Sequence, residues 1–270
     1  TFSFDDLDYA RDPKLIKMFN DAGIKGTYNL MTARIAEYGK ENVQKVYSGH
    51  EVISHSYSHP RMYLTQPEKI NGTLYTPMTL DEVKQDIYQG HEDIKTLTGE
   101  YGLGFVWPYQ DPKKRSDYNE IMDYIKELGI KYVRPTEATY NFELPTDWYH
   151  WETTCHHNAM GYYLDEFLKL DTGGEMKLFS VWGHCYELEP EYTANVHWKE
   201  MQEMTEKIGQ RTDLWKATNG EVYSYIEAMR GAAVDKDGNT IANSSDETLY
   251  VLVNGTKVVI PAHTTFRLGQ

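Results

Sequence analysis

Cysteine, basic charge and long apolar runs are all scarce in this chain of 270 residues. Two cysteines, Cys155 and Cys185, cannot form a disulfide framework; a single bridge is compatible with the sequence, but free thiols and a reducing compartment are expected. The chain has 27 Lys and Arg against 41 Asp and Glu, and its net charge of -14 disfavours nucleic acid and anionic membranes as partners.

No apolar stretch reaches the length of a transmembrane helix, and no signal peptide is visible in these residues. With the acidic net charge, no membrane partner is expected. The sequence opens in a strand-like segment without an initiator methionine, and we therefore expect further residues upstream. A cytoplasmic location is favoured and secretion stays open, as does the oligomeric state.

Aromatic residues are abundant, with 22 Tyr, 6 Trp and 8 Phe. Their flat apolar faces and polar edges suit stacking on sugar rings, although packing of a large core is the alternative explanation. The aromatic residues near predicted strand ends are candidate sugar platforms: Trp107, Trp148, Trp151, Trp182 and Tyr186.

Strand-like and helix-like segments alternate along most of the chain, which predicts parallel strands with right-handed crossovers. Strands are predicted at residues 2–4, 27–30, 51–54, 103–107, 131–134, 177–182 and 214–217. Helices are predicted from residue 12 and at 32–47, 79–97, 116–128, 160–170, 195–209 and 220–230, with an irregular loop at 61–78. Six or seven such units predict a barrel whose active site lies at the carboxyl ends of the strands.

The last residues follow another pattern. From about Ala233 the sequence forms short strand-like segments, two of them joined by Asn254-Gly255, a strong hairpin turn. We expect one barrel domain over 1–232 and a small β extension over 233–270 packed on it, because so short a segment is marginal alone.

Two motifs at predicted strand ends carry ligands suited to a metal ion. His55 and His59 are four residues apart on a predicted turn, since Pro60 disfavours helix at His59. Two histidines and one carboxylate form a familiar ligand set, and Asp6 can supply the carboxylate from the same edge of a parallel barrel. Asp5 would then stay free as a base. The alternative is a pair of exposed loop histidines.

Other strand ends carry Trp107-Pro108-Tyr109 and Val181-Trp182-Gly183-His184, and His184 is well placed to act without binding metal. His156 and His157 are adjacent, so on a strand their side chains would point to opposite faces. We therefore expect them to be structural or to line a cleft.

In order and spacing, these segments resemble the motifs of carbohydrate esterase family 4, the polysaccharide deacetylases with a NodB homology domain, in particular a bacterial branch. Thr1-Phe2-Ser3-Phe4-Asp5-Asp6 is similar to the first motif, Thr-Phe-Asp-Asp, and His55-Ser56-Tyr57-Ser58-His59-Pro60 to the second, His-Ser/Thr-x-x-His-Pro. Pro108-Tyr109 resembles the third, and Val181-Trp182-Gly183-His184 the fifth, Leu-x-x-His. The resemblance covers roughly residues 1–230.

This resemblance implies a distorted (β/α)7 barrel, here with a small C-terminal β-hairpin appendage, that holds one divalent metal ion, most often zinc and in some relatives cobalt or nickel. By position it assigns Asp5 as the general base, His184 as the general acid and the Tyr109 backbone N–H to the oxyanion. The implied metal ligands are Asp6, His55 and His59, and the expected substrate-binding residues are Trp107, Pro108, Trp148, Val181, Trp182 and Arg134.

The chain departs from the family pattern at several positions. Val106 stands where the third motif has an arginine, and Arg134 and Arg61 are the alternatives for its replacement. Asp147-Trp148 is a loose match to the fourth motif, and Leu7 stands where glycine commonly follows the aspartates.

The expected function is hydrolysis of an N-acetyl amide or O-acetyl ester on a saccharide by metal-activated water. Removal of another acyl group or opening of a cyclic amide on the same barrel is one alternative. A carbohydrate-binding relative without activity is the other.

Overall fold

The computed structural model describes residues 1–267, which form two compact units. The first comprises Thr1–Asp171 and Met176–Asn219, and the second comprises Thr172–Glu175 and the chain from Gly220 onward. Within the described residues, no helix is both long and apolar enough to cross a bilayer.

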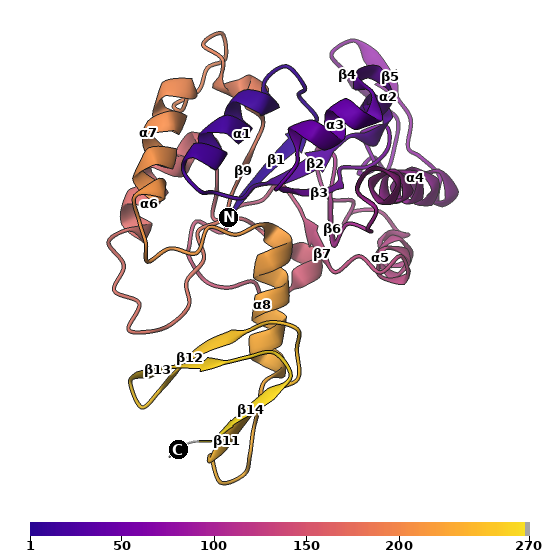
Figure 1. Cartoon of the computed structure of the whole chain (residues 1–270). Helices are drawn as coiled ribbons and strands as arrows, with labels where there is room; N and C mark the ends of the chain where they lie inside the picture. The colour runs from indigo at the N-terminus through magenta and orange to yellow at the C-terminus, as the bar shows by residue number, and fades with distance from the viewer. Residues whose placement is uncertain (268–270) are drawn as a thin grey trace. The chain divides into compact units, whose positions relative to one another are not determined.

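Seven strands form the central sheet of the first unit in the order β7-β6-β3-β2-β1-β9-β8, and every neighbouring pair is parallel. The strands are β1 (Phe2–Asp6), β2 (Thr27–Leu30), β3 (Glu51–Ser54), β6 (Gly104–Val106), β7 (Tyr132–Arg134), β8 (Cys155–His156) and β9 (Val181–Gly183). The sheet curls into a half-barrel flanked by helices (Figure 1), so the predicted distorted (β/α)7 barrel is confirmed.

The flanking helices are α1 (Asp12–Asp21), α2 (Ile35–Tyr38), α3 (Lys40–Val46), α4 (Leu80–Thr98), α5 (Tyr118–Glu127), α6 (Met160–Phe167) and α7 (Trp198–Gly209). The longest, α4, begins where the sequence predicts, because Thr79 and Glu82 form a capping box. Four 3₁₀ turns accompany them: η1 (Thr32–Arg34), η2 (Trp148–His150), η3 (His157–Ala159) and η4 (Cys185–Leu188).

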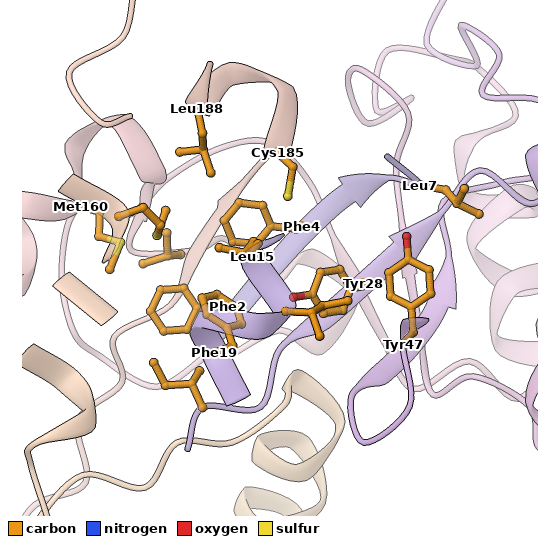
Figure 2. Packing of buried hydrophobic residues seen from close by; sticks show 14 of the residues in the cluster. Phe2, Phe4, Leu7, Leu15, Phe19, Tyr28, Tyr47, Met160, Cys185 and Leu188 are labelled. Carbon is orange, nitrogen blue, oxygen red and sulfur yellow. The ribbon is translucent and has the colours of Figure 1, made fainter. Parts of the chain in front are cut away.

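The main core lies between β1 and the helices on one side of the sheet. Figure 2 shows Phe2 and Phe4 of β1 beside Phe19 of α1, and the Phe2 and Phe19 ring centroids are 5.0 Å apart. Val181 of β9 is buried in the same cluster. Burial of apolar surface contributes about 25 cal/mol per Å² to stability. Because this core holds β1 and its neighbours in place, it also holds the carboxyl edge of the sheet in place.

A second core packs α4 and α5 against β6 and β7. Trp107, expected as a sugar platform, lies in this core instead, with 1% of its surface exposed and its ring 5.0 Å from that of Phe105. The residue directly continues β6, whose three residues are all buried, and its ring offers no face to a ligand.

Three local predictions are wrong. Residues 214–217 are irregular rather than a strand, and the seventh strand is the two-residue β8. The predicted helix at 32–47 breaks into η1, α2 and α3 because Gly39 adopts φ 82°. The loop at 61–78 contains a short hairpin, β4 (Glu68–Ile70) with β5 (Thr73–Tyr75).

The second unit combines α8 (Asn219–Gly231) with two small antiparallel sheets. One contains β10 (Ala233–Val234), β11 (Thr240–Asn243) and β14 (Thr264–Arg267), and the other is the hairpin of β12 (Leu249–Val253) and β13 (Thr256–Ile260). The predicted hairpin at Asn254-Gly255 is confirmed, and both residues adopt the positive φ that this turn requires. The boundary of the predicted extension at residue 233 stays a prediction.

Candidate active site

The residues singled out by sequence lie at the carboxyl ends of four strands of the parallel sheet. Asp5 and Asp6 end β1, His55 follows β3, Arg134 ends β7 and His184 follows β9. Because parallel strands end at one edge, these side chains, far apart in sequence, share that edge of the half-barrel.

Asp6, His55 and His59 form a tight group, here called the ligand cluster. His59 Nε2 lies 3.3 Å from Asp6 Oδ1 and 3.1 Å from His55 Nε2, and His55 Nε2 lies 3.7 Å from Asp6 Oδ1. Tetrahedral zinc with bonds near 2.0–2.1 Å separates its ligand atoms by about 3.3 Å. The three atoms are therefore spaced to share one ion.

Their hydrogen bonding also suits a cation. His55 Nδ1 lies 2.9 Å from the Val106 carbonyl, to which it donates, leaving the Nε2 lone pair directed at the cluster. Asp6 Oδ1 is buried without a hydrogen-bond donor. Burial lowers the pKa of His55, and burial together with the His55 charge lowers the pKa of His59 to about 4, so both rings are neutral and able to ligate at pH 7.

The backbone around the ligand cluster is strained. Five of the nine described non-glycine residues with positive φ lie here: Asp6, Leu7, Ser56, His59 and Tyr109. Leu7 has φ 95° and is buried in the main core, which explains why a glycine is common at this position in the family that the motifs resemble. Such conformations persist where packing enforces them, and they concentrate at functional sites.

Asp5 does not join the cluster but pairs with Arg134, which donates to Asp5 Oδ1 while Asn29 Nδ2 donates to the same oxygen at 2.6 Å. Both members of the ion pair are almost fully buried. Burial raises the pKa of Asp5, but the charges of Arg134, His55 and His184 outweigh it, and the pKa falls to about 2. The carboxylate is therefore ionised at neutral pH.

Arg134 takes the place of the arginine that the third motif lacks. In the sheet it stands directly beside Val106 of β6, the position where the family has its arginine. The guanidinium therefore comes from the adjacent strand. Arg134 is expected from the sequence to contact substrate, but its side chain is buried and contacts Asp5 instead. The other alternative, Arg61, contacts the rings of Tyr75 and Tyr109.

Glu187 links three histidines, and the four side chains are here called the Glu187 cluster. Its Oε2 atom lies 3.0 Å from His184 Nδ1, 3.1 Å from His156 Nε2 and 3.8 Å from His157 Nδ1. Burial lowers the pKa of His184, but the bond to Glu187 and the nearby aspartates raise it more, so the net shift is upward. The hydrogen bond also leaves His184 Nε2 as the free nitrogen.

Sequence reasoning missed Glu187. The only signal was a carboxylate three residues after His184, which η4 brings back toward the histidine. The loose alternative, Asp147, accepts from the Tyr149 backbone N–H at 2.9 Å as a helix cap, and Trp148 packs on Trp151 with ring centroids 5.2 Å apart.

The prediction that His156 and His157 point to opposite faces is wrong. The strand ends at His156 and η3 begins at His157, so the chain turns and the two ring centroids lie 4.2 Å apart. Burial lowers the pKa of His157 to about 3. Its ring packs against Gly183, where an added Cβ would lie 2.1 Å from His157 Nδ1.

Two further aromatic residues frame the site. Tyr109 is two-fifths exposed, and its ring centroid lies 4.5 Å from that of His59. Its backbone N–H has no hydrogen-bond acceptor within residues 1–267. Trp182 lies between Arg134, at 5.1 Å from its ring, and the rings of His156 and His184 at 4.6 and 5.6 Å. Pro108 is buried.

A family model described as polysaccharide deacetylase matches residues 1–133, which include the ligand cluster and Asp5. Comparison with curated protein sequences finds no significant match.

Solved structures with the same fold cover most of the chain at low identity. One is a polysaccharide deacetylase homologue from Mycobacterium smegmatis, with a TM-score of 0.55 and 14% identity over 85% of this chain and 90% of that one. Another is the CE4 domain of a multidomain xylanase from the hindgut metagenome of Trinervitermes trinervoides. Its TM-score is 0.52, with 15% identity over 84% of this chain and 90% of that one. A third is a CE4 family pseudoenzyme from Bacillus anthracis, with a TM-score of 0.51 and 13% identity over 82% of this chain and 64% of that one.

These structures share the fold, while the family match rests on the N-terminal half and its motifs. Over residues 1–133, just under half of the chain, the sequence matches the polysaccharide deacetylase family.

Proposed function

We propose that this protein is a metal-dependent deacetylase that hydrolyses an acetyl amide or ester on a carbohydrate. The observation that carries the proposal is the convergence of Asp6, His55 and His59 within bonding distance of a common centre, beside an ionised Asp5. A zinc ion best suits two imidazoles and one carboxylate, and cobalt or nickel would also fit.

Asp6, His55 and His59 would hold the ion, which when bound lowers the pKa of water and polarises an acyl oxygen. Asp5, held by Arg134 and Asn29, would accept the proton of the attacking water. The Tyr109 N–H, which has no acceptor in the described chain, would donate to the developing oxyanion.

The leaving amine or alcohol needs a proton, and His184 would supply it from Nε2. Glu187 accepts a hydrogen bond from His184 Nδ1, which orients the ring and favours its protonated form. Glu187 would therefore be a positioning residue, while His184 would be the acid. Both cysteines are buried, and no step requires a nucleophilic side chain.

Two other functions use the same fold. Hydrolysis of a different acyl group or of a cyclic amide would need the same ligands and acid. A non-catalytic role is the second, because one structural relative is a pseudoenzyme. The presence of all three candidate ligands with Asp5 and His184 favours catalysis.

The direct test is acetate release from a panel of N- and O-acetylated saccharides, after the protein is loaded with zinc, cobalt or nickel. We expect release from at least one substrate that stops on chelation and returns with metal. Hydrolysis of other acyl sugars without release of acetate would favour a hydrolase for a different acyl group, and metal binding without any turnover would favour a non-catalytic role.

A further inference from the structure

Arg61 differs from the other arginines of the barrel in lacking an acidic partner. Within residues 1–267, the arginines at ion-pair distance from a carboxylate are Arg11, Arg34, Arg115, Arg134, Arg211 and Arg230. Arg61 has no such neighbour in the described chain, although acidic residues outnumber basic ones by 41 to 27. An unpaired guanidinium in so acidic a protein is available to an anion from outside.

Tyrosine rings hold the Arg61 guanidinium in place. Its Cζ lies 3.9 Å from the ring centroid of Tyr109 and 4.9 Å from that of Tyr75, and Nη1 donates to the Tyr63 hydroxyl at 3.3 Å. Arg61 Nε is buried without an acceptor. A guanidinium has five N–H donors, so these contacts fix its plane and leave donors unused.

The segment that carries Arg61 is also anchored. Arg115 donates to the carbonyls of Met62 and Leu64, at 3.4 Å each, and pairs with Asp117. Tyr75, whose ring contacts Arg61, ends the hairpin of β4 and β5, which is labelled in Figure 1. The guanidinium is therefore preorganised, which favours recognition of a rigid ligand.

Arg61 stands next to the ligand cluster. The Tyr109 ring that contacts Arg61 lies 4.5 Å from the ring of His59, whose Nε2 is 3.3 Å from Asp6 Oδ1. A sugar with its acetyl group at the ligand cluster would extend neighbouring substituents over Tyr109 toward the guanidinium.

We propose that Arg61 forms an anion subsite, and that the substrate is an acetylated saccharide bearing a carboxylate on or beside the acetylated sugar. The inference rests on the proposed function and names its substrate class. Arginine binds carboxylate in a planar, bidentate manner, and sulfate or phosphate esters share this chemistry. The net charge of -14 repels polyanions, so we expect an isolated acidic sugar rather than a continuous acidic polymer.

The experiment uses three disaccharides that contain one N-acetylglucosamine and differ in the neighbouring sugar: glucose, glucuronate or glucose 6-sulfate. For the metal-loaded protein we expect kcat/KM to be about tenfold higher with glucuronate than with glucose. Arg61→Gln should remove that ratio, and Arg61→Lys should restore part of it. A preference for the disaccharide with glucose 6-sulfate would assign the subsite to sulfate esters and overturn the proposal of a carboxylate ligand.

Arg211→Gln is the matched control, because it removes the same charge from an exposed arginine paired with Asp213. Its glucuronate-to-glucose ratio should equal that of the wild type. A wild-type ratio near one, or a ratio that Arg61→Gln leaves intact, would overturn the subsite.

Binding of the same disaccharides, measured by calorimetry, separates this inference from the proposed function. Tighter binding of glucuronate that depends on Arg61, without acetate release, would refute the deacetylase and keep the subsite. Acetate release with no dependence of affinity or rate on Arg61 would refute the subsite and support the deacetylase.

Discussion

The ligand cluster and the Glu187 cluster contain the same kinds of side chain, yet they are organised in opposite ways. In the ligand cluster, His55 donates from Nδ1 to a carbonyl, and the Nε2 atoms of His55 and His59 approach to 3.1 Å around a common centre. In the Glu187 cluster, the centre is already a carboxylate oxygen, which accepts from His156 and His184.

The difference lies in the histidine tautomers. His156 Nδ1 accepts from the Asn158 backbone N–H at 3.3 Å, so its proton is on Nε2 and points at Glu187. His55 has the reverse arrangement, with its lone pair on Nε2. Both clusters have ligand atoms close enough to share an ion, but His55 turns a lone pair toward the centre of the ligand cluster, whereas His156 turns an N–H toward Glu187. Composition and proximity therefore do not define a metal site unless the hydrogen bonds on the outer nitrogens agree.

The largest expected effect separates the two clusters by metal content. His59→Ala should lower bound metal and reduce kcat/KM by on the order of 10³-fold, because the ion supplies several kcal/mol of transition-state stabilisation. His156→Ala should leave metal content unchanged. Elemental analysis of both variants checks this, and loss of metal in His156→Ala but not in His59→Ala would invert the assignment.

A second experiment probes the carboxylate at the centre of the Glu187 cluster. Glu187→Gln keeps the shape but removes the charge that raises the pKa of His184, so that pKa should fall. Since a general acid acts when protonated, the alkaline limb of kcat/KM should move to lower pH and the maximum should drop about 100-fold. Glu187→Asp should recover part of both effects. An unshifted pH profile in Glu187→Gln would show that His184 does not depend on this carboxylate.

A third experiment concerns Asp5, whose pKa responds to the charges of His55 in one cluster and His184 in the other. Arg134→Gln leaves a buried carboxylate without its cation and should lower the free energy of unfolding by about 3–5 kcal/mol at pH 7.

The stabilising contribution of this ion pair should depend on pH, because the pKa of Asp5 is depressed. The Asp5 pKa is depressed to about 2, so its stabilising contribution is present above its unfolded value near 4 and is lost as pH falls toward 2. The difference between wild type and Arg134→Gln in urea denaturation should therefore shrink from pH 7 to pH 3. Equal losses at both pH values would mean that packing, not charge, links the two residues.

The smallest expected effect tests whether His157 is a packed ring rather than a ligand. Gly183→Ala places a Cβ against His157 Nδ1 and should destabilise the protein by about 1–3 kcal/mol, seen as a lower thermal midpoint. Combining it with His157→Ser should recover much of that loss. A single variant as stable as the wild type would show that the ring moves freely.

Sequence motifs were sufficient to bring together the ligand cluster, because each ligand follows a strand and parallel strands end at one edge. They did not identify Glu187, since its contact with His184 depends on the 3₁₀ turn η4 rather than on strand periodicity. The error at His156 and His157 has the same origin: a period of two was applied across a point where β8 ends and η3 begins.

The amino-acid sequence by itself determined most of the βα units, the match to the polysaccharide deacetylase family and the residues of the ligand cluster, because hydrophobic periodicity and local turn motifs are properties of short segments. Only the tertiary structure decided that Arg134 rather than Arg61 neutralises Asp5, through the register that sets Val106 beside Arg134 across β6 and β7. A register between strands depends on how the whole sheet packs, so no single segment encodes it.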